Sequence, residues 1–465
     1  MKNKKLCIFI VIFMFTLFIC FLNPAGGKEN SSKSESSTRT NVEEIKKELV
    51  GLRGLIFYSE VAVGKKTVPE VRSLYKKELR KELTPSKELS MKETMQTFGF
   101  IPRNYNISKF LLDMYTEQVA GFYDTTTKKL YLTEKNEKDY NEKRNEEMMK
   151  TMGISMNDWI ALHELDHALQ DQNFDLDIIE KDIEAFNDDD YTLALKSVIE
   201  GEATFVMMDE MMKKWGIDIS GSFSDLGNFM EEASMQTGGY DIFSKAPAIF
   251  RRTLSFPYFQ GLNFIITVKR AGGWKAVNLL YSDVPDSTEQ ILHPEKYLYE
   301  RDFPVQVSFK QIPRRIDNYV MIDDNVVGEF AADVFVSQYL SPADGKAAAG
   351  GWGGDRYRTY SSGTGSFIIW FTNWDTRGDA GKFMKYLGKV MSRKYPGRAA
   401  RKFNGSSLLL WEKGTVSGCI EKKGKDVIVI IDAPYAAIEK IRLMLWQSGK
   451  HKMKRPVLVR FQRND

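Results

Sequence analysis

The sequence predicts an α+β fold, with helices and strands grouped in different stretches of the chain. Helical periodicity dominates before residue 300, interrupted by a predicted strand hairpin near residues 117–133, whereas several strands are predicted after residue 366. At 465 residues the chain exceeds one typical domain, and its hydrophobic content of 43% can supply a large core. We therefore expect two or three packed units rather than a single one.

The N-terminus has the pattern of a leader segment. Residues 1–5 are basic and residues 6–22 form an apolar run without charge. This predicts a signal peptide over residues 1–27, with an uncleaved membrane anchor as the alternative and lipidation at Cys20 as a weaker one. The serine-rich residues 28–42 are expected to form a disordered polar tether. We thus expect an extracytoplasmic protein: secreted, periplasmic, or membrane-anchored and facing outward.

Charge and cysteine content exclude some classes of protein. The 66 basic and 62 acidic residues give a net charge of +4, which argues against nucleic-acid binding. Of the three cysteines, Cys419 alone lies beyond the leader, so the body of the chain cannot build an internal disulfide framework.

A helical segment and a hairpin are predicted before residue 135. Residues 43–110 are expected to form helices, with a break near 65–69 and a helix end near Pro85. The strands of the hairpin are predicted at 119–123 and 129–133. An edge strand at this place can hold an extended peptide substrate, while an ordinary sheet hairpin is the alternative.

His163-Glu164-Leu165-Asp166-His167 is the most informative stretch of the chain. Residues four apart lie on one face of a helix, so His163 and His167 can bind the same metal ion. Glu164 lies beside that face, where it can reach a metal-bound water without ligating the metal. The pattern is the H-E-x-x-H arrangement of zinc-dependent peptidases.

A catalytic zinc usually needs a third protein ligand. Residues 170–173 are Gln, Asp, Gln and Asn, which excludes the three-histidine pattern. A glutamate from a later helix is the remaining common solution. The predicted helix 191–215 offers two, Glu200 and Glu202.

Three motifs carry a resemblance to a known family: G-F-Y-D (121–124), H-E-L-D-H-A-L-Q-D-Q (163–172) and E-G-E-A-T (200–204). The chain resembles gluzincin-type zinc metallopeptidases, and more closely a set of poorly characterised secreted bacterial H-E-x-x-H proteins. In gluzincins a polar residue four positions after the ligand glutamate commonly braces a ligating histidine. Thr204 follows Glu200 at that distance, so the resemblance implies Glu200 as the ligand and keeps Glu202 as the alternative. Threonine in place of the usual aspartate departs from the pattern.

The resemblance also implies the remaining roles. His163, His167 and Glu200 would hold Zn²⁺, and Glu164 would act as the general base. Gluzincins often supply a histidine or tyrosine to stabilise the oxyanion; His293 is the candidate, with Tyr297 behind it. A structural histidine before a proline is the alternative interpretation.

The expected domains are a catalytic domain over residues 111–315 and an accessory α+β domain over residues 316–465. The catalytic core is expected to combine the hairpin, the H-E-x-x-H helix and the ligand helix. In the accessory domain we predict a helix at 325–340 followed by a loop at 341–357. Further predicted elements are strands at 366–374, 407–411, 415–421 and 426–432 and helices at 379–394 and 435–447.

These observations predict a secreted or membrane-tethered zinc metallopeptidase that hydrolyses peptide bonds. The alternatives are a catalytically silent, peptidase-like envelope binding protein and a zinc hydrolase that acts on other bonds. An intact Glu164 argues against the silent protein, because a binding module has no use for a general base.

Overall fold

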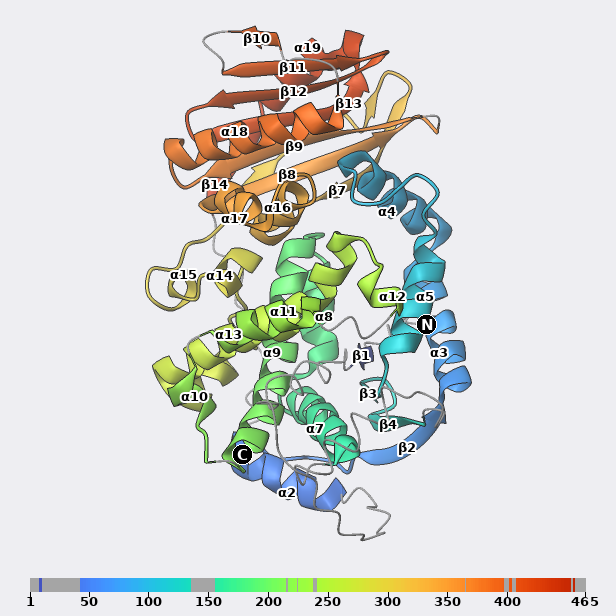
Figure 1. Ribbon diagram of the computed structural model, residues 1–465, viewed down its shortest axis with the longest axis vertical. Coiled ribbons are helices and arrows are strands. Elements are labelled where there is room, and N and C mark those ends of the chain that lie inside the picture. Colours follow the sequence, from blue (N-terminus) through green and yellow to red (C-terminus); the bar gives the residue numbers. More distant parts are fainter. Residues whose placement is uncertain are drawn as a thin grey trace.

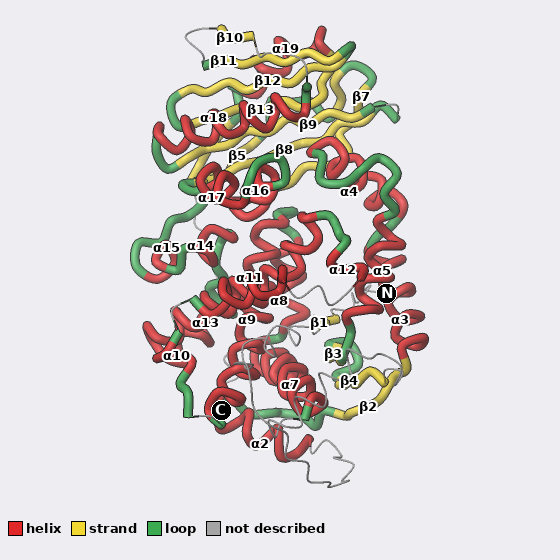
Figure 2. Tube along the Cα trace, in the orientation of Figure 1, coloured by secondary structure: helices red, strands yellow, loops and turns green. Residues whose placement is uncertain are grey.

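The computed structural model describes residues 8–10, 42–134, 155–214, 216–223, 225–236, 241–363, 365–396, 401–403, 407–452 and 455. The α+β class is confirmed: a helical part and a C-terminal sheet lie at opposite ends of the molecule (Figure 1). Figure 2 shows most strands gathered in the C-terminal part. Within the described residues, no helix is long and apolar enough to span a membrane. Apart from residues 8–10 and 42, the predicted leader and tether lie outside the described residues.

Thirteen helices make up the helical part as described: α2 (Val42–Arg53), α3 (Val68–Glu82), α4 (Pro85–Phe98), α5 (Ile107–Gln118), α7 (Met156–Phe174), α8 (Leu176–Glu184), α9 (Asp189–Lys213), α10 (Ile219–Ser222), α11 (Leu226–Gln236), α12 (Asp241–Ser244), α13 (Ala248–Leu279), α14 (Thr288–Leu292) and α15 (Glu295–Leu298). Most of them pack around one hydrophobic core, to which α7, α9 and α13 contribute heavily. α13 is interrupted at Gly272 and Gly273, where the dihedral angles are not helical.

α9 and α13 touch backbone to backbone. A Cβ atom added to Gly201 would lie 2.4 Å from the carbonyl carbon of Gly261, and one added to Gly261 would lie 2.3 Å from Ser197 O. Real side chains do not tolerate such distances, so both positions require glycine. The crossing point is next to Glu200.

A small sheet lies beside α7. Its strands are β1 (Ile8–Ile10), β2 (Ala62–Thr67), β3 (Gly121–Asp124) and β4 (Lys129–Glu134), in the order β1-β3-β4-β2. β3 and β4 form the predicted hairpin. The predicted break near residue 65 is in fact β2, which pairs with β4 in parallel. β1 pairs antiparallel with the outer edge of β3, with Phe9 opposite Tyr123.

The C-terminal part is built on an eight-stranded antiparallel sheet of order β10-β11-β12-β13-β9-β8-β7-β6. Its strands are β6 (Arg315–Ile316), β7 (Tyr319–Asn325), β8 (Trp352–Ser361), β9 (Ser366–Trp374), β10 (Arg401–Phe403), β11 (Leu408–Lys413), β12 (Val416–Lys423) and β13 (Asp426–Pro434); β5 (Val305–Ser308) and β14 (Gly449–Lys452) form a separate pair. The helices are α16 (Gly328–Ser337), α17 (Pro342–Ala349), α18 (Arg377–Lys394), η2 (Tyr435–Ala437) and α19 (Ile438–Leu445). Helices α16, α17 and α18 share a core with one face of the sheet, and α19 packs against the other face.

The prediction of a loop at 341–357 is wrong, because this stretch forms α17 and the start of β8. Ser341 caps α17, and proline at its first position is compatible with a helix start. Glycines in this stretch allow close packing against neighbouring elements. A Cβ atom on Gly354 would lie 2.3 Å from the backbone oxygen of Val305 on β5.

The predicted helical segment 43–110 does not act as one unit. α2 packs against α7, whereas α4 packs against the C-terminal sheet. Phe98 at the end of α4 enters the core of the sheet, with its ring 5.9 Å from that of Trp370. The N-terminal segment therefore joins the two parts of the molecule.

Candidate metal centre

α7 carries the H-E-x-x-H motif and is deeply buried. Its first turn is capped by Ser155, whose Oγ accepts a hydrogen bond of 3.3 Å from Asp158 N. Every residue from Trp159 to Asp171 is buried. Because close-packed neighbours surround this stretch, its polar side chains are held in fixed directions.

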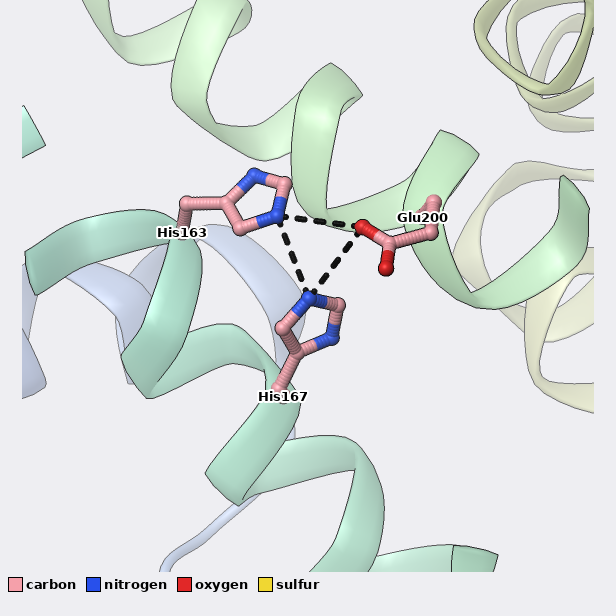
Figure 3. A group of neighbouring side chains, drawn as sticks. All are labelled: His163, His167 and Glu200. Carbon is pink, nitrogen blue, oxygen red and sulfur yellow. Dashed lines mark hydrogen bonds and ion pairs between the residues drawn. The ribbon is translucent and has the colours of Figure 1, made fainter. Parts of the chain in front are cut away.

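His163, His167 and Glu200 point toward one another from α7 and α9 (Figure 3). His163 Nε2 lies 3.2 Å from Glu200 Oε2 and 3.1 Å from His167 Nε2. His167 Nε2 lies 3.4 Å from Glu200 Oε2. All three ligand atoms thus lie within 4.8 Å of one another. We call these residues the triad. Two imidazole nitrogens and one carboxylate oxygen form a donor set that suits zinc.

The triad has strong internal electrostatics. Burial opposes a charge on His167, but Glu200 and then Glu164 raise its pKa to about 9. Burial also opposes ionisation of Glu200, but His167 and His163 lower its pKa to about 2. Burial lowers the pKa of His163, against its hydrogen bond with Glu200. The metal-free triad therefore pairs a carboxylate with a positive charge on His167.

Glu164 is fully buried and is held by the small sheet. Its Oε2 accepts a hydrogen bond of 2.6 Å from Tyr123 N, in the middle of β3. Its charge is close enough to the triad to affect the pKa of His167. Glu164 thus lies between the candidate metal ligands and the strand on which β1 is paired.

The carboxylate of Glu202 points away from the triad, toward Arg53 and Tyr281. Its Oε1 accepts a hydrogen bond of 2.7 Å from Arg53 Nε, and its Oε2 accepts one of 2.9 Å from Tyr281 OH. The guanidinium of Arg53 also lies 4.0 Å from the ring of Trp274. Glu202 therefore anchors α2 and α13 to α9 and is not part of the triad.

The contacts of Thr204 do not agree with a role in bracing a histidine. Its Oγ1 is buried and, among the described residues, has no hydrogen-bond partner. Gln170 makes a contact of this kind instead, because its Oε1 lies 3.0 Å from His167 Nδ1. Sequence reasoning missed Gln170, although residues 167 and 170 are three apart and so share a helix face.

His293 and Tyr297 make their hydrogen bonds with residues outside the triad. His293 Nε2 lies 3.0 Å from Glu329 on α16, and Tyr297 OH donates to Asp283 O at 2.7 Å. His293 ends α14, which binds the first turn of α9 through Thr288 N and Asp190. Ten residues of helix, or ~15 Å, separate Asp190 from Glu200. The contacts are those of the alternative interpretation, a structural histidine.

Tyr258 on α13 is an aromatic residue that approaches the triad. Its ring stacks on His163 with centroids 6.2 Å apart and an interplanar angle of 21°. It is buried and lies one turn before Gly261, where α13 touches α9. The sequence contained no signal for this contact, because it depends on how two distant helices cross.

A second cluster brings three ligand atoms within the same distance: Glu289, Asp302 and Asp375. We call it the acidic cluster. The ammonium of Lys296 lies inside it, 2.6 Å from Glu289, 3.3 Å from Asp302 and 2.7 Å from Asp375. The cluster joins α14 and α15 to the end of β9, so its role is structural.

Comparison with known proteins gives one match. Residues 315–442 match a domain of unknown function, DUF8575. The match covers all eight strands of the C-terminal sheet and begins well after the triad. None of the curated proteins and none of the solved structures with which the chain was compared matches it.

Proposed function

We propose that the protein is a zinc-dependent metallopeptidase of the gluzincin type that acts outside the cytoplasm. The observation that carries the proposal is the convergence of His163, His167 and Glu200 with Glu164 beside them. The location rests on the leader pattern of residues 1–27.

The donor set fits the proposed metal. Both histidines offer Nε2 and Glu200 offers Oε2 to the same point, and the centre is buried, which suits a tightly held ion. When bound, zinc would supply an acidified water and a Lewis acid for the scissile carbonyl.

Glu164 would supply the proton transfers. It would accept a proton from the attacking water and deliver it to the leaving amine. The hydrogen bond from Tyr123 N holds one carboxylate oxygen in place, so the base is oriented before substrate arrives. Tyr258 would fix the plane of the His163 ring by stacking on it.

The proposed substrate is an extended peptide bound along β3. This edge pairs with residues 8–10 in the structure, so its backbone groups accommodate an antiparallel strand. A peptide in the place of β1 would pass Tyr123, the residue that binds the general base. Cleavage would then occur next to Glu164.

The proposal is tested with purified full-length protein and its Glu164→Gln variant. We expect about one zinc per chain in both proteins, because Glu164 is not a ligand. Proteomic cleavage profiling should show peptide hydrolysis by the parent and a loss of ~10²–10⁴-fold in the variant. A variant that keeps zinc and cleaves as fast as the parent would overturn the mechanism.

Two other results would favour the two alternative functions. A parent that binds zinc and peptides but cleaves none would favour the silent binding protein. A parent that hydrolyses esters or other amide-free substrates but not peptides would favour the zinc hydrolase of another class.

A further inference from the structure

The amide group of Gln170 connects three parts of the centre. Its Oε1 lies 3.0 Å from His167 Nδ1. Its Nε2 donates to Asp166 Oδ2 at 2.9 Å and to Ile199 O at 3.1 Å. The side chain is fully buried, so water cannot take over these bonds if the amide is removed.

These bonds allow one orientation of the amide. Ile199 O is a backbone carbonyl and can only accept a hydrogen bond, so the NH₂ group of Gln170 must face it. The amide oxygen then faces His167. An amide oxygen also only accepts, and His167 Nδ1 must therefore carry the hydrogen.

The consequence for His167 is a fixed tautomer. With the hydrogen on Nδ1, the lone pair of the neutral ring is on Nε2, the atom that faces His163 and Glu200. This is the form in which a histidine binds a metal through Nε2. The opposite tautomer would place a hydrogen where the metal belongs.

Gln170 also links the two ligand-bearing helices by a hydrogen bond. Its own residue lies on α7, one turn after His167, while its acceptor Ile199 on α9 directly precedes Glu200. Through this one side chain, the position of His167 is linked to the backbone next to Glu200.

We propose that Gln170 is a positioning residue that fixes the tautomer and orientation of His167 and ties it to the ligand helix α9. This proposal rests on the proposed metal site, but not on any activity. Removing such a partner of a ligating histidine typically weakens metal binding by ~10–100-fold.

The first test compares zinc affinity in Gln170→Met, Gln170→Glu and Gln172→Met. Methionine keeps the length and volume of glutamine without its polar atoms. Glutamate keeps an acceptor for His167 Nδ1. Gln172 is the matched control, because it lies on the same helix and binds the backbone of Ser59.

We expect the zinc dissociation constant, measured by competition with a chelator, to rise ~10–100-fold in Gln170→Met. Gln170→Glu keeps the acceptor for His167 Nδ1 but loses the donor to Ile199 O and places a second carboxylate beside Asp166, so it should recover only part of this loss. Gln172→Met should match the parent. Unfolding in the presence of EDTA, followed by circular dichroism, separates a loss of stability from a loss of zinc binding. A folded Gln170→Met protein whose zinc affinity stays within twofold of the parent would overturn the proposal.

A second measurement needs no variant of Gln170 and so decides the matter if Gln170→Met does not fold. The chain has four histidines, so selective ¹⁵N-histidine labelling gives four imidazoles to resolve. Zinc bound at Nε2 already requires a hydrogen on Nδ1, so the readout is the hydrogen bond that this N–H donates. The Nδ1 proton of His167, assigned by its loss in His167→Asn, should be shifted downfield in the zinc-loaded parent, because Gln170 Oε1 accepts it. A proton at the position of a ring N–H without a hydrogen-bond acceptor would overturn the proposal.

The two proposals fail in different ways. A parent with one zinc, the expected tautomer and no hydrolysis of any peptide would contradict the peptidase while leaving the role of Gln170 intact. A parent that cleaves peptides but whose zinc affinity is indifferent to Gln170→Met would do the reverse.

Discussion

The triad and the acidic cluster each bring three ligand atoms within 4.8 Å of one another, but different cations balance their negative charge. In the acidic cluster the positive charge is the ammonium of Lys296, attached to the chain in the middle of three carboxylates. Burial alone would lower the pKa of Lys296, but Glu289 and Asp375 raise it above its usual value. In the triad the positive charge is a proton on His167.

The difference teaches how to separate a metal site from a structural ion pair in this protein. A proton can leave and be replaced by a metal ion, whereas the lysine ammonium cannot leave. The number of carboxylates that converge therefore does not identify a metal site. The cation that already balances their charge is more informative, and substitutions in each cluster test this distinction.

The largest effect is expected at the two glutamates of α9. Glu200→Ala should weaken zinc binding by ~10³-fold or more, because it removes one of three ligands. Elemental analysis after dialysis should find almost no zinc in this variant. One remaining zinc per chain would mean that the acidic cluster or another site binds the metal.

Glu202→Ala is the matched control for Glu200→Ala. It should keep its zinc but lower the free energy of unfolding by about 3–5 kcal/mol, because Arg53 is left as a buried charge without its carboxylate. Urea unfolding monitored by circular dichroism measures this loss. If Glu202→Ala lost zinc and kept its stability, the two assignments would have to be exchanged.

A smaller effect is expected at the acidic cluster. Lys296→Met should lower the free energy of unfolding by about 2 kcal/mol, a value between those of buried and surface ion pairs since the lysine side chain is 23% exposed. Zinc content should not change. The control is methionine at the exposed Lys385, which should alter stability by less than about 0.5 kcal/mol. If the zinc content changed in Lys296→Met, the acidic cluster would also influence zinc binding, and the triad could no longer be separated from it as the metal site.

A pH-dependent effect is expected from the proton balance of the triad. Because the pKa of His167 is raised from 6.5 to about 9, this group stabilises the metal-free protein fully below pH 6.5, and the stabilisation is lost as pH rises through about 9. Zinc must displace the proton, so zinc affinity should change in the opposite direction and rise about tenfold per pH unit between pH 7 and 9. Competition titrations over this range measure the slope. A flat profile would show that the metal-free triad carries no such proton.

The sequence predicted the parts of the fold and site that depend on local spacing. The hairpin of β3 and β4 and most strands after residue 366 were found where alternation and turn residues indicated them. The face shared by His163 and His167 follows from the helical period alone. β2 was missed because its Gly-Lys-Lys sequence has no strand pattern, and pairing with β4 supplies its conformation.

The choice between Glu200 and Glu202 could not be made from their spacing. Residues two apart on a helix point about 200° from each other, so one of them had to face away from α7. Which one does so depends on Arg53, a residue far away in the sequence that meets Glu202 only in the folded protein. The same limit applies to His293 and Tyr258. Sequence distance from the motif did not indicate which of them approaches His163.

The contact of Gly201 with Gly261 has a consequence for how this protein can change over evolutionary time. The contact sets the spacing between the helix that bears Glu200 and the helix that bears Tyr258, and there is no room for even one methyl group. For the proposed peptidase, a misplacement of ~1 Å in the catalytic site can cost ~10²-fold in rate, so a larger residue at either glycine should lower activity as well as stability. Descendants of this chain that keep the triad should therefore keep the smallest residue at both positions, even where the surrounding helices diverge.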